Sequence, residues 1–343
     1  MKDTHILSTL QDLAPAEGPS QPRPTLVFDA CHVGVVLRAV LFVPIVLNIV
    51  TDPHPLYHWV HMAPDDHVLH AKQFYLNVPF FIGRNVFYFV FWFVVASIIR
   101  ASSLKQDETL DQKLAQKRTN FSAPIFVFFV LFMTFTMTDW VMSLEPHWFS
   151  SVQPVLLAVG QALSALSLMV FIVMANRDKE PYRSIVTPGL TKDLGNMLFT
   201  LTLLWTYLTL SQFLIQWSGN LPEEAPYYIR RAGESWNILG TLVILLQFFV
   251  PFLALLAPRT KRYAKSLMMV ALLIFVVRFF DIYWSVMPAV REGTFMTSLA
   301  HWTDYVALLA IGGLWFGLFS IQSKKGALVP KHDTRLTEVG HAH

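Results

Sequence analysis

The sequence has little charge and almost no cysteine. Asp, Glu, Lys and Arg make up 14% of the 343 residues and hydrophobic residues make up 54%, whereas a soluble domain carries about 25% charged residues. The single cysteine, Cys31, excludes an intramolecular disulfide and any cysteine-ligated cluster. The composition therefore excludes an ordinary soluble protein and is typical of a membrane-embedded chain.

The sequence also lacks the motifs that hold cofactors. No CxxCH, phosphate loop or glycine-rich dinucleotide motif is present. None of the 12 histidines lies in the middle of an apolar stretch, where an axial ligand of a b-type haem would be expected. We therefore predict that the chain binds no metal or haem of its own. One alternative stays open, because one expected outer loop holds a group of histidines that could bind zinc, namely His54, His58, His61, His67 and His70.

Long apolar stretches are the main feature of the sequence. Eight of them are long enough to cross a hydrocarbon core of about 30 Å as helices. They cover approximately residues 32–51, 78–99, 122–143, 151–175, 193–217, 235–257, 264–288 and 302–321. The predicted fold class is therefore an all-α polytopic membrane protein. Residues 1–30 and 323–343 are expected to form polar tails, and the apolar core of a signal peptide is missing from the first of them.

The basic residues predict the orientation. The loops after the second, fourth and sixth stretches, together with the C-terminal tail, hold 17 Lys and Arg residues, whereas the opposite loops hold 4. By the positive-inside rule the richer side is cytoplasmic, which places both termini in the cytoplasm. We expect a multi-pass protein of the bacterial inner membrane.

Charged residues inside the apolar stretches are costly, about 2.5–3.5 kcal/mol each on insertion scales, and are candidates for function. They are Arg38, Arg84, Asp139, Arg278 and Asp281, with Asp193 and Asp304 near the ends of stretches. Most of these lie toward the expected outer side. Arg278 and Asp281 are three residues apart and share one helical face, so they can pair directly.

These charges allow two interpretations. One is a set of structural ion pairs, and the other is a polar pocket or proton path. A polar stripe on the fifth stretch, formed by Asn196, Thr200, Tyr207 and Ser211, favours the second slightly, although such side chains also serve helix packing. Gln161, Ser164 and Ser167 form a shorter stripe on the fourth stretch.

A short internal repeat is present. The third stretch ends in DWVMSLEP, from Asp139 to Pro146, and the seventh ends in DIYWSVMP, from Asp281 to Pro288. Each segment has an acid seven residues before a proline. The spacing of four stretches between the two segments fits two parallel four-helix repeats.

Several segments resemble the ActF subunits of bacterial alternative complex III, a quinol:cytochrome c oxidoreductase. They are KQFYLNVPFFIGRNVFYFVFWF from Lys72, TDWVMSLEPHWFSS from Thr138, DLGNMLFTLTLLWTYLTLSQFLIQWSGNLPEE from Asp193 and RFFDIYWSVMP from Arg278. The resemblance implies an NrfD-like membrane subunit with two four-helix bundles. Applied to this chain, it assigns residues 31–175 to the first bundle and residues 176–322 to the second.

The resemblance also implies partners. The subunit would lie beside an ActC-like NrfD paralogue, an iron–sulfur subunit, c-type cytochrome subunits, small membrane subunits and lipids, with no nucleic acid. Haem c and iron–sulfur clusters would belong to those partners. The family is also described as quinone-binding, so the resemblance implies quinone as a ligand.

The sequence departs from the family pattern in three respects. Met133 stands six residues before Asp139, where the paralogue that oxidises quinol has a His, and a Met cannot accept a quinol proton. Gln247 stands where many relatives have a His. Relatives usually have about ten helices, so the first bundle is expected to lack one.

Three functions follow as hypotheses. The first is a non-redox subunit of the oxidoreductase, structural and proton-conducting, which is not catalytic alone. The second is a direct quinone-binding subunit, and the third is a stand-alone secondary transporter. The predicted outer or quinone-like pocket comprises Arg84, Asp139, Trp140, Glu145, His147 and Trp148. The predicted proton relay comprises Asp193, Thr200, Tyr207, Ser211, Arg278 and Asp281.

Overall fold

The protein is a bundle of long, roughly parallel helices. The structure, a computed structural model, describes residues 26–52, 56–61, 65–109, 112–179, 182–233, 235–291, 293, 295, 297 and 301–325. Every regular element within these ranges is a helix, and eight of the helical segments are long and apolar enough to cross a membrane. The predicted fold class, an all-α polytopic membrane protein, is confirmed.

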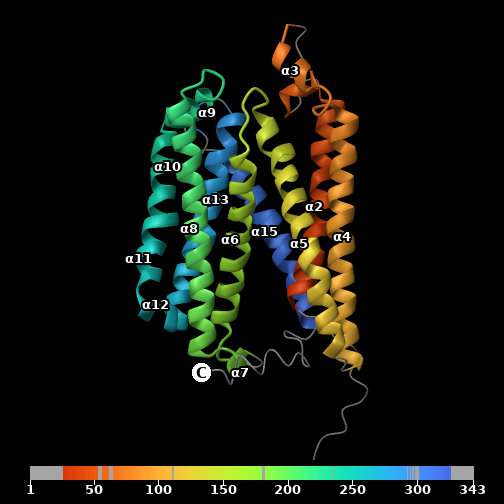
Figure 1. The fold of residues 1–343 in the computed structure, drawn as a ribbon, viewed down its shortest axis with the longest axis vertical. Helices are drawn as coiled ribbons and strands as arrows, with labels where there is room; N and C mark the ends of the chain where they lie inside the picture. The colour runs from red at the N-terminus through yellow and green to blue at the C-terminus, as the bar shows by residue number, and fades with distance from the viewer. Residues whose placement is uncertain are drawn as a thin grey trace, which may run out of the picture.

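Long helices run along the bundle, and short helices lie in most of the connections between them (Figure 1). The long segments are α2 (Leu26–Thr51), α4 (Val78–Thr109), α5 (Gln112–Trp140), α6 (Val152–Ala175), α8 (Pro188–Gly219), α10 with η3 and α11 (Trp236–Ile244, Leu245–Phe249, Val250–Leu256), α13 (Ala264–Val290) and α15 (Trp302–Lys325). The short ones are η1 (His58–Val60), α3 (His67–Lys72), η2 (Met142–Leu144), α7 (Tyr182–Ile185), α9 (Ala225–Ala232) and α12 (Pro258–Arg262).

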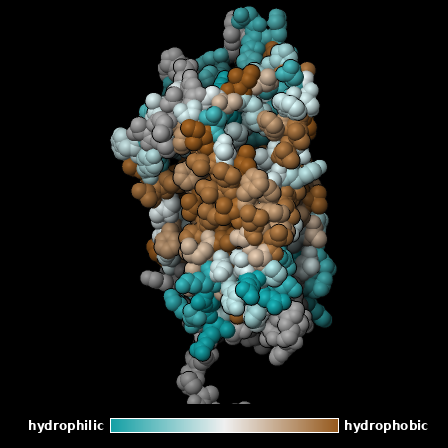
Figure 2. Space-filling view, turned by 90° about the vertical axis from the view of Figure 1, so that its left-hand side faces the viewer, coloured by the Kyte–Doolittle hydropathy of each residue, from teal (hydrophilic) through white to brown (hydrophobic). Residues whose placement is uncertain are grey.

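The short helices mark the two ends of the bundle. The elements α3 and α9 lie at one end, which we call the α9 face, and α7 and α12 lie at the other, which we call the α12 face (Figure 1). A broad brown band of apolar residues covers the middle of the surface between two hydrophilic ends (Figure 2). This is the surface that a lipid bilayer requires, since apolar side chains meet the hydrocarbon and polar ones meet water.

Several helix limits differ from the predicted ones. The helix α2 begins at Leu26, within the residues 1–30 that were predicted to form the polar tail, and its membrane-crossing part begins at Gly34. The fifth membrane helix begins at Pro188 rather than at residue 193, because the Thr187 side chain accepts a hydrogen bond from the Leu190 amide and proline is favoured in the first turn. The C-terminal tail from residue 326 lies outside the described residues, and α15 extends to Lys325.

The helices group differently from the predicted bundles. The fourth membrane helix, α6, packs mainly against α13 and α8, and the last one, α15, packs against α2. One group therefore contains α2, α4, α5 and α15, and the other contains α6, α8, α10–α11 and α13 (Figure 1). The division at residues 175 and 176 does not describe this packing, because the last helix of each half of the chain lies with the other half.

The second group holds the larger apolar core. Leu163, Leu198, Leu255, Leu267 and Ile274 are fully enclosed there. In the first group, Phe42, Phe81, Trp59 and their neighbours form a separate core near the α9 face. Each group is thus packed well enough to hold buried polar side chains in fixed positions.

Candidate functional site

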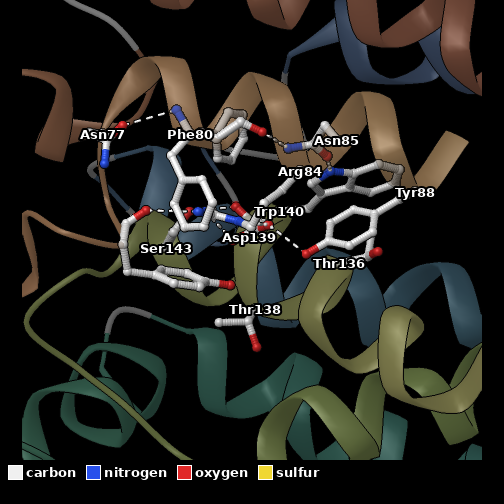
Figure 3. A network of polar contacts seen from close by, with 12 residues as sticks. Asn77, Phe80, Arg84, Asn85, Tyr88, Thr136, Thr138, Asp139, Trp140 and Ser143 are labelled. Atoms are coloured by element: carbon white, nitrogen blue, oxygen red, sulfur yellow. Dashed lines mark hydrogen bonds and ion pairs between the residues drawn. The ribbon is translucent and has the colours of Figure 1, made fainter. Parts of the chain in front are cut away.

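The first polar centre, which we call the Arg84 centre, lies between α4 and α5. Arg84 donates from Nε to Asp139 Oδ2 at 3.0 Å and from Nη2 to Oδ1 at 2.9 Å, a two-pronged ion pair. The Asp139 side chain is fully enclosed. The Tyr88 hydroxyl donates to Asp139 Oδ2 at 3.4 Å. Two of the charges that the sequence places inside apolar stretches therefore form an ion pair (Figure 3).

The surroundings fix both members of this ion pair. The Arg84 guanidinium also donates to the Tyr75 carbonyl at 2.9 Å and lies 3.8 Å from the centre of the Tyr75 ring. Burial, followed by the charge of Asp139, raises the pKa of the Tyr75 hydroxyl. Beside the pair, Trp140 donates from its indole nitrogen to Asn85 at 2.5 Å, which joins α5 to α4 a second time.

A connecting segment of residues 141–151 carries the other predicted pocket residues along the α9 face. Glu145 accepts from Arg230 at 2.8 Å and from Arg231 at 3.1 Å, and both arginines belong to α9. Trp148 stacks on Tyr227 with ring centres 4.0 Å apart. The segment therefore holds α9 against the end of the bundle.

His147 contacts a different element, α3. Its Nε2 atom lies 2.7 Å from Asp66, the residue that caps α3, and its side chain is 60% exposed. The predicted pocket is thus divided: Arg84, Asp139 and Trp140 form one centre, while Glu145, His147 and Trp148 connect surface elements. The structure does not bring these six side chains into a single pocket.

The second polar centre, which we call the Arg278 centre, lies in the other helix group. Arg278 and Asp281 form an ion pair within α13, and both side chains are almost fully buried. The guanidinium of Arg278 rests on Gly160 of α6, where a Cβ atom would overlap it. The absence of a side chain at residue 160 is what leaves room for this arginine.

A cavity of about 260 Å³ adjoins this ion pair. It lies between α6, α8, α9, α10 and α13, and its wall includes Arg278, Asp281, Arg231 and several aromatic side chains. Tyr227, also in the wall, accepts a hydrogen bond from Gln153 at 3.1 Å, and burial raises the pKa of its hydroxyl. The Arg278 centre therefore combines buried charge with space for water or a ligand.

The other predicted relay residues lie elsewhere. Thr200 and Tyr207 are on the exposed face of α8, where the Tyr207 side chain is 67% exposed, and Asp193 is exposed near the α12 face. Ser211 is half-buried. None of these four residues lines the cavity described above. Of the six predicted relay residues, the structure brings together only Arg278 and Asp281.

The polar residues of α8 that do face the bundle were not singled out from the sequence. They are Thr191, Thr202, Gln212 and Gln216. Arg231 and Gln153, in the cavity region, were also missed as site residues. The signal was weak, because one Thr or Gln among many on an apolar helix does not show which face is buried until the neighbouring helix is known.

The two repeated segments have matching local contacts. Ser143 donates to the Asp139 carbonyl at 2.5 Å, and Ser285 donates to the Asp281 carbonyl at 2.9 Å. The segments differ in helix continuity, because α5 ends at Trp140 whereas α13 continues to Val290. Each half of the chain therefore places one buried Arg–Asp pair beside the same short pattern.

Within the described residues, no group of three His, Cys, Asp or Glu side chains could hold a metal ion. His54, one of the five loop histidines considered for zinc, lies outside the described residues. The fold and the two buried centres define an integral, multi-pass membrane protein. No protein-family model and no curated protein sequence matches the chain.

Proposed function

We propose that the chain is an integral membrane subunit of a quinol:cytochrome c oxidoreductase of the alternative complex III type, in a bacterial electron-transport chain. Its role is structural and proton-conducting, and the redox cofactors belong to partner subunits. The proposal starts from the segments that resemble the ActF subunits, and three of the four carry members of the two buried Arg–Asp pairs. The proposed location is the inner membrane, with both termini in the cytoplasm.

The observation that carries the proton-conducting role is the pair of buried Arg–Asp centres, one in each half of the chain. Charged side chains inside a membrane are costly, so those that a protein retains there are candidates for function. The two centres differ in access. Asp139 is fully enclosed by its partners, whereas Asp281 lies in the wall of the cavity, where water can reach it. We therefore assign proton exchange to Asp281 and a fixed, structural charge to Asp139.

The experiment uses the purified complex in proteoliposomes, with cytochrome c reduction and proton movement recorded together. Asp281→Asn should lower proton movement by a factor on the order of 10² if it is an obligatory transfer group, while electron transfer from quinol continues. Asp178→Asn serves as the control, since that carboxylate is 85% exposed. Full proton-coupled turnover in Asp281→Asn would refute the relay.

Direct quinone binding is the second candidate, and it has one specific observation in its favour. The Arg84 centre combines an enclosed carboxylate with the Tyr88 hydroxyl and the rings of Tyr75 and Phe80, groups that can hold a ring carrying polar oxygens. Labelling by an azido-quinone separates the two candidates. Labelled residues in α4 or α5 would favour quinone binding here, and labelling confined to the paralogue would exclude it.

A stand-alone transporter is distinguished by purification. The proposed subunit should be isolated together with partners that contain haem, whereas a transporter is isolated without them. A visible haem spectrum in the affinity-purified sample, together with cytochrome c reductase activity, is the expected result.

A further inference from the structure

The cavity of the second helix group has an excess of positive charge. Arg231 and Arg278 both line it, and their side chains are only 1% and 2% exposed. The described carboxylates in contact with them are Glu145 and Asp281. Glu145 is shared with a third arginine, Arg230. Glu145 and the half-exposed Arg230 do not line the cavity, so two guanidinium groups face one carboxylate, Asp281, in its wall.

Parts of the two buried guanidinium groups lack a protein partner. The Nε and Nη2 atoms of Arg278 and the Nε atom of Arg231 are enclosed and make no hydrogen bond. The other nitrogen atoms of Arg231 are occupied, because Nη1 donates to Glu145 and to the Tyr227 carbonyl and Nη2 donates to the Ser285 carbonyl at 2.7 Å. An enclosed charged donor without an acceptor is costly, so an acceptor of negative charge fits here.

The cavity opens toward the side of the molecule that meets lipid. Phe213 of α8 and Thr241 and Ile244 of α10 all line it, and all three residues are also exposed. Both helices belong to the apolar membrane-crossing set. A ligand can therefore enter sideways from the bilayer, with an apolar chain left between α8 and α10.

The rest of the cavity wall suits the headgroup of an amphiphile. Trp205, Trp284, Tyr227 and Tyr228 supply rings with apolar bodies, and Tyr and Trp are the residues that favour the boundary between lipid and water. Asn237, at the start of α10 and near the α9 face, adds an amide. The basic end of the cavity and its apolar mouth thus match the two ends of an anionic lipid.

From these observations we infer that the cavity binds a phosphate oxyanion between Arg231 and Arg278, carried by an anionic phospholipid that enters between α8 and α10. The negative charge balances the guanidinium charge of the two arginines in the cavity wall, and its oxygens accept from these guanidinium groups. This inference does not rest on the proposed proton path or on any quinone, although the cavity is the one that Asp281 lines. It assigns the site a bound lipid that fixes α8, α10 and α13 relative to one another.

The test compares two tryptophan substitutions on one helix. Thr241 lines the cavity mouth, whereas Leu242 is exposed on the same helix and does not line it. The intact protein, with its partners, is purified in a detergent free of phosphorus and washed extensively. Phospholipid retained per copy is then measured by ³¹P NMR and by mass spectrometry of the extracted lipids.

We expect Thr241→Trp to lose one anionic phospholipid per copy and Leu242→Trp to retain the wild-type amount. Arg278→Gln should show the same loss. If the Arg278→Gln protein does not fold, the comparison of Thr241→Trp with Leu242→Trp still tests the inference. A second arm titrates washed protein with ³³P-labelled orthophosphate. Binding that Arg278→Gln abolishes, without any difference in retained lipid, would assign the oxyanion to free phosphate.

Equal phosphorus in wild type and Thr241→Trp, together with no orthophosphate binding that depends on Arg278, would overturn the inference. Recovery of a neutral ring compound instead, displaced by Thr241→Trp, would overturn it as well. A normal proton yield in the Thr241→Trp variant would separate the lipid site from the proposed proton path.

Discussion

At the residue scale, the two buried arginines show two ways of holding a charge inside a membrane protein. Arg84 is bonded through Nε, Nη1 and Nη2, to one carboxylate and one carbonyl. Arg278 has its ion pair with Asp281 and otherwise rests on the backbone at Gly160. The first arrangement is complete within the protein, and the second leaves donor atoms available to a ligand or water.

Gly160 is the residue on which the position of Arg278 depends. Gly160→Ala would place a methyl group inside the guanidinium, so we expect a loss of about 1–3 kcal/mol of stability from overpacking. Gly83→Ala is the matched control, because Gly83 is also helical and a Cβ there meets nothing within 4 Å. It should be neutral or stabilising by up to about 1 kcal/mol.

Thermal unfolding of the purified protein, followed by circular dichroism, measures both variants. A Gly160→Ala protein as stable as Gly83→Ala, with unchanged phospholipid content, would show that Arg278 is not held against α6 in this way.

Asp66 provides a pH-dependent contact outside the membrane-crossing segments. The Leu69 amide, and then His147, lower the pKa of the Asp66 carboxyl. A lowered pKa means that the carboxylate stabilises the start of α3 above its ordinary pKa of about 3.9, and that this contribution is lost as the pH falls below that value. A spin label at residue 70 should therefore become more mobile as the pH falls from about 3.9 through the lowered pKa of Asp66.

Asp66→Ala is the comparison for this titration. The label at residue 70 should already be mobile at pH 7, because the cap of α3 is missing. Equal mobility at pH 7 and at the acid end of the titration, where Asp66 is protonated, in the unsubstituted protein would contradict the assigned role.

At the element scale, the sixth membrane helix is interrupted by the π-helical turn η3. Pro251 follows this turn, and a proline clashes with the carbonyl four residues before it, here that of Gln247. The wider turn accommodates the proline without ending the helix. It also places the Gln247 side chain in the interior, where neither amide atom has a hydrogen-bond partner.

Gln247→Leu tests whether the buried Gln247 amide destabilises the protein or is bonded to water or a ligand. Removing an enclosed polar group that lacks a protein partner should raise stability by about 1–3 kcal/mol, visible as a higher midpoint of thermal unfolding. The isosteric control is Gln247→Glu, which should destabilise because it adds charge at a fully buried site. A destabilised Gln247→Leu protein would instead show that the amide is bonded to water or to a ligand.

At the scale of the whole molecule, the ends of the bundle predict orientation. Glu223 lies at the α9 face and Lys179 lies at the α12 face, and both side chains are exposed. We expect a cysteine at residue 223 to react with an impermeant maleimide in intact cells whose outer membrane has been opened, and one at residue 179 to react only after lysis.

Each cysteine is introduced into a protein that carries Cys31→Ser, since Cys31 is the only native cysteine and would otherwise react. Reaction at residue 179 before lysis, with protection at residue 223, would reverse the orientation. Reaction of both before lysis would contradict the arrangement of faces in Figure 1.

The sequence alone determined the class and most of the helices. Apolar length predicts membrane-crossing helices directly, because a helix in lipid must satisfy its own backbone and needs a minimum span. The sequence also identified the residues of both ion pairs, since a charge within an apolar stretch stands out. The shared Ser contacts at Asp139 and Asp281 likewise lie in segments whose repetition was visible beforehand.

Only the tertiary structure decided which helices share a core and which faces are buried. The polar stripe through Thr200 and Tyr207 lies on the exposed side of α8, because an apolar helix with lipid on one side and protein on the other has little amphipathic pattern to read. The exchange of α6 and α15 between groups, and the cavity at Arg278, depend on side-chain packing between distant segments. Composition and length act locally, whereas these contacts depend on the shapes of surfaces that meet only in the folded protein.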